Sequence, residues 1–285
     1  MKKRVLLCFV LVLSSCVTAL AQQAPMQPLT FWYEFAVNPG KDEQFLDLVK
    51  TVGAPVRDKL MADGVVLAWG VQTPLLRVPG NATHMIWYAV ADWSGVEKVQ
   101  TAMQTQIAKL TEEAAKGGAT KKGAVPSQSP AARIAEIADV SKTHDYLTRD
   151  LVFNVTHNPM PDGFLPYSRY NFIKVKPGKG ADFRKTWEKY NKPVLDKLLA
   201  DGVIVAYGLA VEEVRTDGDF THFTWYDVRD LSQFDKIRAT FMADREHRSQ
   251  EEQDAINELF NSLIDADASR QEVTHSVMFK AAPMK

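Results

Sequence analysis

The sequence predicts an α+β fold, in which two ferredoxin-like βαββαβ repeats pack sheet to sheet as a pseudo-dimeric α+β barrel. First, residues 39–99 match residues 177–237 without a gap, and 25 of the 61 aligned positions are identical. Second, the apolar pattern inside each copy alternates between strand and helix periods. Third, each sheet would leave one aromatic-rich face bare, and joining two such faces contributes about 10–15 kcal/mol as an upper bound.

The first copy supplies its elements in order. An aromatic strand at 30–37 precedes a helix at 41–63, in which Pro55 predicts a kink or break. Gly64 then suits the C-terminal end of that helix. Strands at 65–71 and 83–90, a helix from residue 94 and a closing strand at 147–155 complete the βαββαβ order.

The second copy repeats this plan and closes with a strand at 273–281. We therefore assign the first repeat to residues 28–157, a linker to 158–164 and the second repeat to 165–281. The copies differ mainly before the closing strand. Residues 116–130 are a low-complexity insertion that we expect to be flexible, whereas 244–269 predict one continuous helix.

Residues 1–21 have the pattern of an export signal. A basic start, an apolar stretch too short to span a membrane and the small residues Ala19 and Ala21 fit cleavage before Gln22. This predicts a periplasmic or secreted protein. The alternative is a lipoprotein anchored through Cys16, because residues 13–16 resemble a lipobox.

Composition excludes several classes. The net charge of −1 gives no electrostatic footprint for nucleic acid, and no later stretch is long and apolar enough for an integral membrane segment. Cys8 and Cys16 both lie in the signal, so the mature chain has no disulfide and no thiolate metal site.

The order of strand, Pro-Gly-Lys turn and helix, followed by Trp-Tyr-x-Val-x-Asp before the next helix, resembles the dimeric α+β barrel superfamily. The similarity is greatest to NIPSNAP-like and antibiotic-biosynthesis-monooxygenase-like proteins, and it covers most of residues 30–281. Members are often homodimers of one module, so a tandem pair would imitate that dimer. The resemblance implies a monomer with pseudo-two-fold symmetry or a homodimer. It also implies activities that range from cofactor-free oxidation of small aromatic substrates to haem binding or degradation.

His84 and His222 are the first candidate catalytic residues because they hold the same place in both repeats. Alternation along a strand puts each on one face with Tyr88 or Tyr226. We expect this more polar face to line the barrel, where the four side chains would share one cavity. The alternative is a structural histidine at a strand end, hydrogen-bonded to Thr83 or Thr221.

Glu34 is a further candidate base if it points inward, where burial would raise its pKa; the alternative is a solvated or paired carboxylate. The aromatic pairs at matching positions are candidate ligand-binding residues or ordinary core: Trp32 with Tyr170, and Trp69 with Tyr207. No histidine spacing predicts a metal site.

Three functions remain open from the sequence. The first is an exported barrel that binds a small apolar or aromatic ligand, with its activity undetermined. The second is a cofactor-free or haem-associated monooxygenase-like enzyme. The third is a structural or partner-binding protein whose barrel is filled with side chains. The sequence does not decide whether the protein is an enzyme, nor which cofactor or ligand it takes.

Overall fold

The computed structural model describes residues 27–282 except 79, 118–127, 157, 159, 162 and 217–219. The predicted signal at 1–21, and residues 118–127 of the predicted insertion, lie outside this description.

The first half follows the predicted order of elements. Its strands and helices are β1 (Leu29–Val37), α1 (Asp42–Leu48), η1 (Val49–Gly53), α2 (Ala54–Ala62), β2 (Val66–Pro74), β3 (His84–Val90), α3 (Trp93–Gly117), α4 (Pro130–Ile137) and β4 (Ala138–Val155). The predicted break at Pro55 is confirmed. It takes the form of a five-residue π-helix, η1, between two α-helical segments. Gly64 adopts φ +75° directly after the second of these, as a C-terminal glycine does.

The second half repeats the order. Its elements are β5 (Tyr167–Val175), α5 (Gly180–Tyr190), α6 (Lys192–Ala200), β6 (Ala206–Glu212), β7 (His222–Val228), α7 (Gln233–Glu246), α8 (Gln250–Leu263) and β8 (Ile264–Ala281). The continuous helix predicted at 244–269 is wrong. Ser249 and Glu252 form a capping box that starts a new helix, and the chain is already extended from Ile264.

The eight strands form one closed barrel in the order β1-β3-β2-β8-β5-β7-β6-β4, with β4 returning to β1. β4 and β8 are each 18 residues long. Each pairs with the first strand of its own half and the second strand of the other half, which gives the pairs β4–β6 and β2–β8. The halves are therefore joined by backbone hydrogen bonds as well as by the packing of their inner faces.

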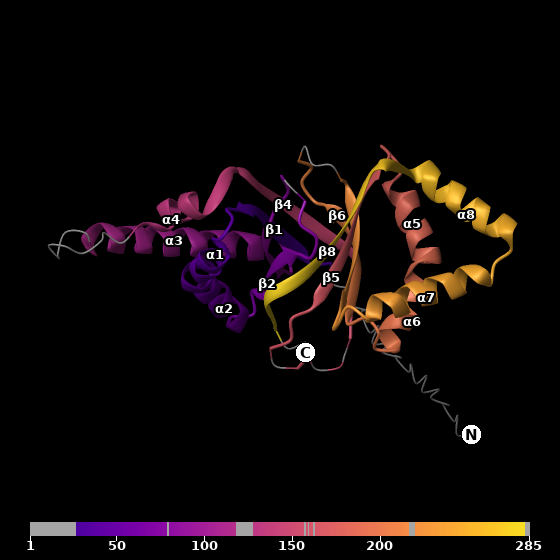
Figure 1. Ribbon diagram of the computed structural model, residues 1–285, viewed down its shortest axis with the longest axis horizontal. Coiled ribbons are helices and arrows are strands. Elements are labelled where there is room, and N and C mark those ends of the chain that lie inside the picture. The colour runs from indigo at the N-terminus through magenta and orange to yellow at the C-terminus, as the bar shows by residue number, and fades with distance from the viewer. Residues whose placement is uncertain are drawn as a thin grey trace, which may run out of the picture.

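The helices lie in two groups outside this barrel. Figure 1 shows α1–α4 on one side of the strands and α5–α8 on the other. Each group buries one apolar core against the outer face of its own half. A third core fills the barrel with side chains from both halves, namely Trp32, Tyr146, Tyr170, Phe172, Ala210, Phe220 and Phe223. The predicted α+β architecture of two βαββαβ repeats is thus confirmed.

Two glycines permit the closure between halves. An added Cβ at Gly70 would lie 3.0 Å from Trp87 Nε1, and one at Gly208 would lie 2.5 Å from Trp225 Nε1. Each glycine pairs across the joint between the halves, Gly70 with Phe279 and Gly208 with Phe153. The missing side chain leaves room for the indole next to each glycine.

Separate expression of residues 27–160 and 161–282 should give species that self-associate. Each half alone exposes the unpaired edges of its second and fourth strands and half of the barrel interior. Size-exclusion chromatography with light scattering measures the masses. As a control, co-expression of the two halves should restore a one-to-one complex. Two soluble monomeric halves would contradict the closed barrel.

Candidate functional site

The barrel interior is packed with aromatic side chains. Trp32 stacks on Tyr146 at 5.9 Å and meets Tyr170 edge to face at 5.7 Å. The space enclosed by Trp32, Met85, Tyr146, Tyr170, Phe172 and Phe223 has no volume that admits a water molecule. Trp32 and Tyr170 therefore lie inside the barrel, as a ligand-binding role would need, but their neighbours already fill the space between them.

Glu34 also faces inward. Tyr146 Oη donates to Glu34 Oε1 at 3.0 Å. Near it, Arg270 pairs with Glu272 at 3.1 Å and lies over the ring of Phe172 at 3.9 Å. Burial raises the pKa of Glu272, while Arg270 opposes this rise. Glu34 thus belongs to a set of polar side chains next to the aromatic core. Its role as a base stays a prediction.

The expectation that His84, Tyr88, His222 and Tyr226 share an internal cavity is wrong. Tyr88 and Tyr226 lie in the two helix-covered cores, and the histidine rings pack on helix residues, His84 on Phe45 and His222 on Phe183. The inward face of β3 carries Met85 and Trp87 instead, which pair with Gln72 and Gly70. The more polar face of the strand was expected to line the barrel. In the structure the helices bury this His-Tyr face, and aromatic residues fill the barrel.

The two histidines have the alternative role that the sequence left open. Thr83 Oγ1 lies 3.1 Å from His84 Nδ1, and Thr221 Oγ1 lies 3.0 Å from His222 Nδ1. The Thr83 hydroxyl also bonds both Val37 N and Phe35 O at the end of β1. Burial lowers the pKa of each histidine to about 4, so both are neutral at pH 7. Each Thr-His pair thus stabilises the end of a strand.

Trp69 and Tyr207 also face the helices. Trp69 Nε1 donates to Asp58 Oδ1 at 3.0 Å, and Tyr207 contacts the matching Asp196 through its hydroxyl. These two aspartates occupy equivalent helix positions, in α2 and α6. The pairs therefore anchor helix to sheet in both halves, and their predicted role in ligand binding stays untested.

The barrel wall contains a buried carboxyl group in Asp150. Its side chain is almost inaccessible, at 4% exposure, and accepts a hydrogen bond from Trp225 Nε1 at 2.9 Å. Burial raises the pKa of Asp150 to about 7, and the bond from Trp225 opposes that rise. Among the described residues no basic side chain pairs with Asp150, so no counter-charge offsets its burial.

An unusual group in the described part of the chain is Arg57 on α2. It is only 3% exposed, and its Nε and Nη1 have no hydrogen-bond partner among the described residues. Burial lowers the pKa of Arg57, with Tyr33, Tyr88 and Asp58 as the opposing neighbours. A buried guanidinium without an acceptor is costly, so such a group indicates a missing partner.

Two tyrosines lie near this guanidinium, and a glutamine bonds to both of them. Gln100 Nε2, on α3, donates to Tyr33 Oη at 2.7 Å and to Tyr88 Oη at 3.1 Å. The Arg57 guanidinium also lies 5.8 Å from the centre of the Trp69 ring. We call Arg57, Tyr33, Tyr88 and Gln100 the Arg57 cluster. It lies between the outer face of the sheet and the helices of the first half.

Local backbone structure makes room for Arg57. A Cβ at Gly53 would lie 2.3 Å from Arg57 Nη1, so a larger residue at position 53 would require the guanidinium to move. Gly53 ends the π-helix η1, an irregularity that is frequent at functional sites. In the second half the same positions hold Asn191 and Leu195, and Trp187 replaces Val49. Leu195 and Trp187 are buried there in an apolar core, so only the first half carries the charge.

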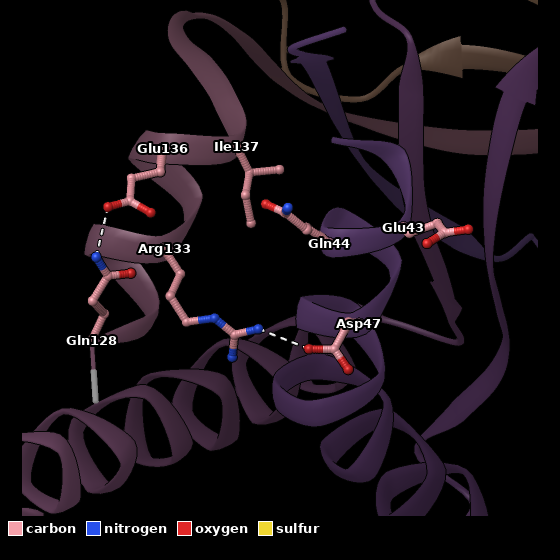
Figure 2. A pocket seen from close by; sticks show the side chains of 7 residues that line it. All are labelled: Glu43, Gln44, Asp47, Gln128, Arg133, Glu136 and Ile137. Atoms are coloured by element: carbon pink, nitrogen blue, oxygen red, sulfur yellow. Dashed lines mark hydrogen bonds and ion pairs between the residues drawn. The ribbon is translucent and has the colours of Figure 1, made fainter. Parts of the chain in front are cut away.

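A separate pocket of about 370 Å³ lies on the surface between α1 and α4. Figure 2 shows its side chains, and within it Arg133 pairs with Asp47 at 2.9 Å while Gln128 donates to Glu136 at 2.6 Å. These groups already bond one another and are largely exposed. We therefore assign no ligand to this pocket.

Comparison with known proteins rests on structure. No family model matches the chain, and no curated protein is significantly similar to it in sequence. A proposed monooxygenase from Fusobacterium nucleatum subsp. nucleatum ATCC 25586 matches with a TM-score of 0.58 at 12% identity, covering 90% of this chain and 96% of that one. A second proposed monooxygenase, from Lactobacillus acidophilus NCFM, gives 0.53 at 8%, covering 90% and 97%. An anthrone oxidase-like protein gives 0.50 at 10%, covering 91% and 95%.

The chain has the dimeric α+β barrel fold. At these identities the similarity establishes the architecture, and the chemistry has to be argued from the residues of this chain. Within this barrel the Arg57 cluster is the site that the sequence analysis missed. A signal for it was present. Residues 55–65 and 193–203 agree more closely than any other block of the repeat, yet they oppose Arg57 to Leu195 at a position of the helical apolar stripe.

Replacing Asp150 with Asn should stabilise the protein more at pH 8 than at pH 5. The pKa of about 7 in the folded state exceeds the ordinary aspartate value of 3.8, so the folded state holds the proton to a higher pH than the unfolded state does. The stability from this group is therefore lost as pH rises from about 4 to 7, by at most about 4 kcal/mol.

Urea unfolding of both proteins at each pH gives the difference between their free energies of unfolding. Titration of His84 and His222 cancels in that difference, and the exposed Asp267→Asn serves as a control that should show no such trend. An Asp150→Asn effect that is equal at pH 5 and pH 8 would contradict the raised pKa.

Proposed function

We propose that the protein is a small-molecule-binding barrel whose ligand site is the Arg57 cluster. The observation that supports this proposal is the buried guanidinium of Arg57, which has two nitrogens without acceptors among the described residues. A buried guanidinium without acceptors lowers the stability of the folded protein. Such a destabilising group is expected to persist where it serves ligand binding. The filled barrel centre argues against a ligand there.

The two halves then have different tasks. The second half fills its helix–sheet interface with Trp187 and Leu195, and it completes the barrel through β6 and β8. The first half keeps the equivalent interface polar through Arg57 and Gln100. We therefore expect one ligand for each chain.

The two histidines at equivalent positions of the repeats are already engaged in local contacts. His84, which the sequence marked for proton transfer, has Nδ1 beside Thr83 and Nε2 facing Asp42 at 3.6 Å. The matching His222 also engages Thr221. Both rings are buried against helix residues, His84 on Phe45 and His222 on Phe183, so these residues do not fit haem.

Arg57→Leu tests the proposal because the second half shows that leucine packs at this position. The free energy of unfolding without ligand should rise by about 1–4 kcal/mol, since an uncompensated buried charge is replaced by an apolar side chain. A screen of small molecules of mixed charge, read by melting temperature, should yield binders that stabilise the wild type.

The same binders should lose most of their effect on Arg57→Leu. Arg238→Gln is the matched control, because it removes one exposed positive charge at the position equivalent to Gln100. It should keep the binding. Binders that act equally on all three proteins, or the absence of any binder that depends on Arg57, would refute the site.

We also propose that the mature protein is exported, on the pattern of residues 1–21. Among the described residues no helix is long and apolar enough to cross a membrane. Mass spectrometry of the mature chain from its native cell should give an N-terminus at Gln22. A lipidated Cys16 would make it an anchored lipoprotein, and an intact Met1 would refute export.

A further inference from the structure

The Arg57 cluster contains an excess of hydrogen-bond donors. Gln100 donates to both tyrosine hydroxyls, and these hydroxyls also share a hydrogen bond. Arg57 adds N–H groups, of which those on Nε and Nη1 lack an acceptor among the described residues. A guanidinium has no acceptor to offer in return. The cluster is therefore completed by a group that accepts hydrogen bonds.

The charged groups near Arg57 also leave its positive charge unbalanced. Among the described residues, Asp58 is the one carboxylate that acts on Arg57, and both of its oxygens already have partners. Its Oδ1 accepts from Trp69 at 3.0 Å, and its Oδ2 pairs with Lys280 at 2.6 Å. Asp145 acts on Tyr33 but is not among the groups that act on Arg57. The positive charge of Arg57 thus has no dedicated counter-charge in the described part of the chain.

The equivalent helix–sheet interface of the second half has no buried arginine that needs a partner. Leu195 replaces Arg57, Asn191 replaces Gly53, and Asn171 and Arg238 stand where Tyr33 and Gln100 do. Leu195 is buried there among apolar residues. The arginine, the glycine that makes space for it and the two polar residues that face it thus differ together from their counterparts, as expected when several residues serve one site.

We propose that the ligand of the Arg57 cluster is an oxyanion, a small molecule whose carboxylate or similar oxygen group pairs with the guanidinium. This inference rests on the proposed function and narrows it to one charge class. The oxyanion supplies the acceptors that Arg57 lacks. Of the Tyr33 and Tyr88 hydroxyls, the one that does not donate to the other can donate to the oxyanion as well. Charge-assisted bonds of this kind are the strong ones in proteins.

Benzoate and benzamide are matched probes, because they share a ring and differ in charge. In calorimetric titrations at constant ionic strength, benzoate should bind the wild type roughly tenfold or more tightly than benzamide. Inorganic phosphate, titrated separately, distinguishes an inorganic oxyanion from an organic carboxylate. Arg57→Leu should reduce benzoate binding to the level of benzamide, and Arg57→Lys should keep part of the preference.

Gly53→Ala provides a second variant that tests position without removing charge. The new Cβ should displace the guanidinium and weaken benzoate binding. Helical stability should be kept, because alanine suits a helix better than glycine does. Arg238→Gln should bind benzoate as the wild type does, which excludes a general effect of net charge.

The outcomes separate the two proposals. Equal binding of benzoate and benzamide, or benzoate binding that survives Arg57→Leu, overturns the oxyanion inference and leaves the binding site to the mixed-charge screen. The absence of binding by both benzoate and phosphate also overturns it. If that screen nevertheless yields neutral binders that depend on Arg57, the proposed function stands without the oxyanion.

Discussion

The hydrogen bonding of β4 and β8 across the two halves is the constraint on which the structure depends. Each of these long strands belongs to one repeat and completes the sheet of the other. A ferredoxin-like sheet alone has two free edges and one bare face, and both problems are solved together when the sheets close. Closure also fixes which side chains point inward, so it decides that aromatic residues fill the centre while the His-Tyr faces lie under the helices.

Because the barrel is closed and filled, variation between the halves is concentrated at the two helix–sheet interfaces. These interfaces have the same backbone plan, yet one is apolar and the other holds a charge. A homodimer of one module could not differ in this way, since both copies would carry the same residue. Joining the copies in one chain lets one interface contribute packing while the other keeps a group that costs stability.

Much of the fold could be predicted from the sequence, because it depends on patterns that repeat. The break at Pro55 and the glycine after the helix follow from local chemistry, and the second copy confirms both. The length of β4 and β8 could not be predicted in this way. Residues 138–146 and 264–272 are polar and charged, and their extended conformation comes from pairing with the first strand of the same half. The helix expected up to residue 269 failed for the same reason.

The site was harder to predict than the fold. Alternation correctly placed His84 with Tyr88 on one face, but it contains no information on whether that face lies inside the barrel or under helices. Choosing the more polar face was wrong because the helix-covered side holds its polar groups by local bonds, such as those from Thr83 and Thr221. Arg57 was overlooked because an arginine on a helix is ordinarily solvated, and only the comparison with Leu195 marks it as buried.

The filled centre of the barrel has a mechanical consequence. Hydrostatic pressure unfolds proteins mainly by eliminating internal voids, and the volume change of unfolding scales with them. The interlocked rings around Trp32 enclose no space for a water molecule, so this region contributes little to that volume change. Compression therefore has little to act on at the centre of the barrel, and the packing that excludes a ligand there also makes the barrel stiff.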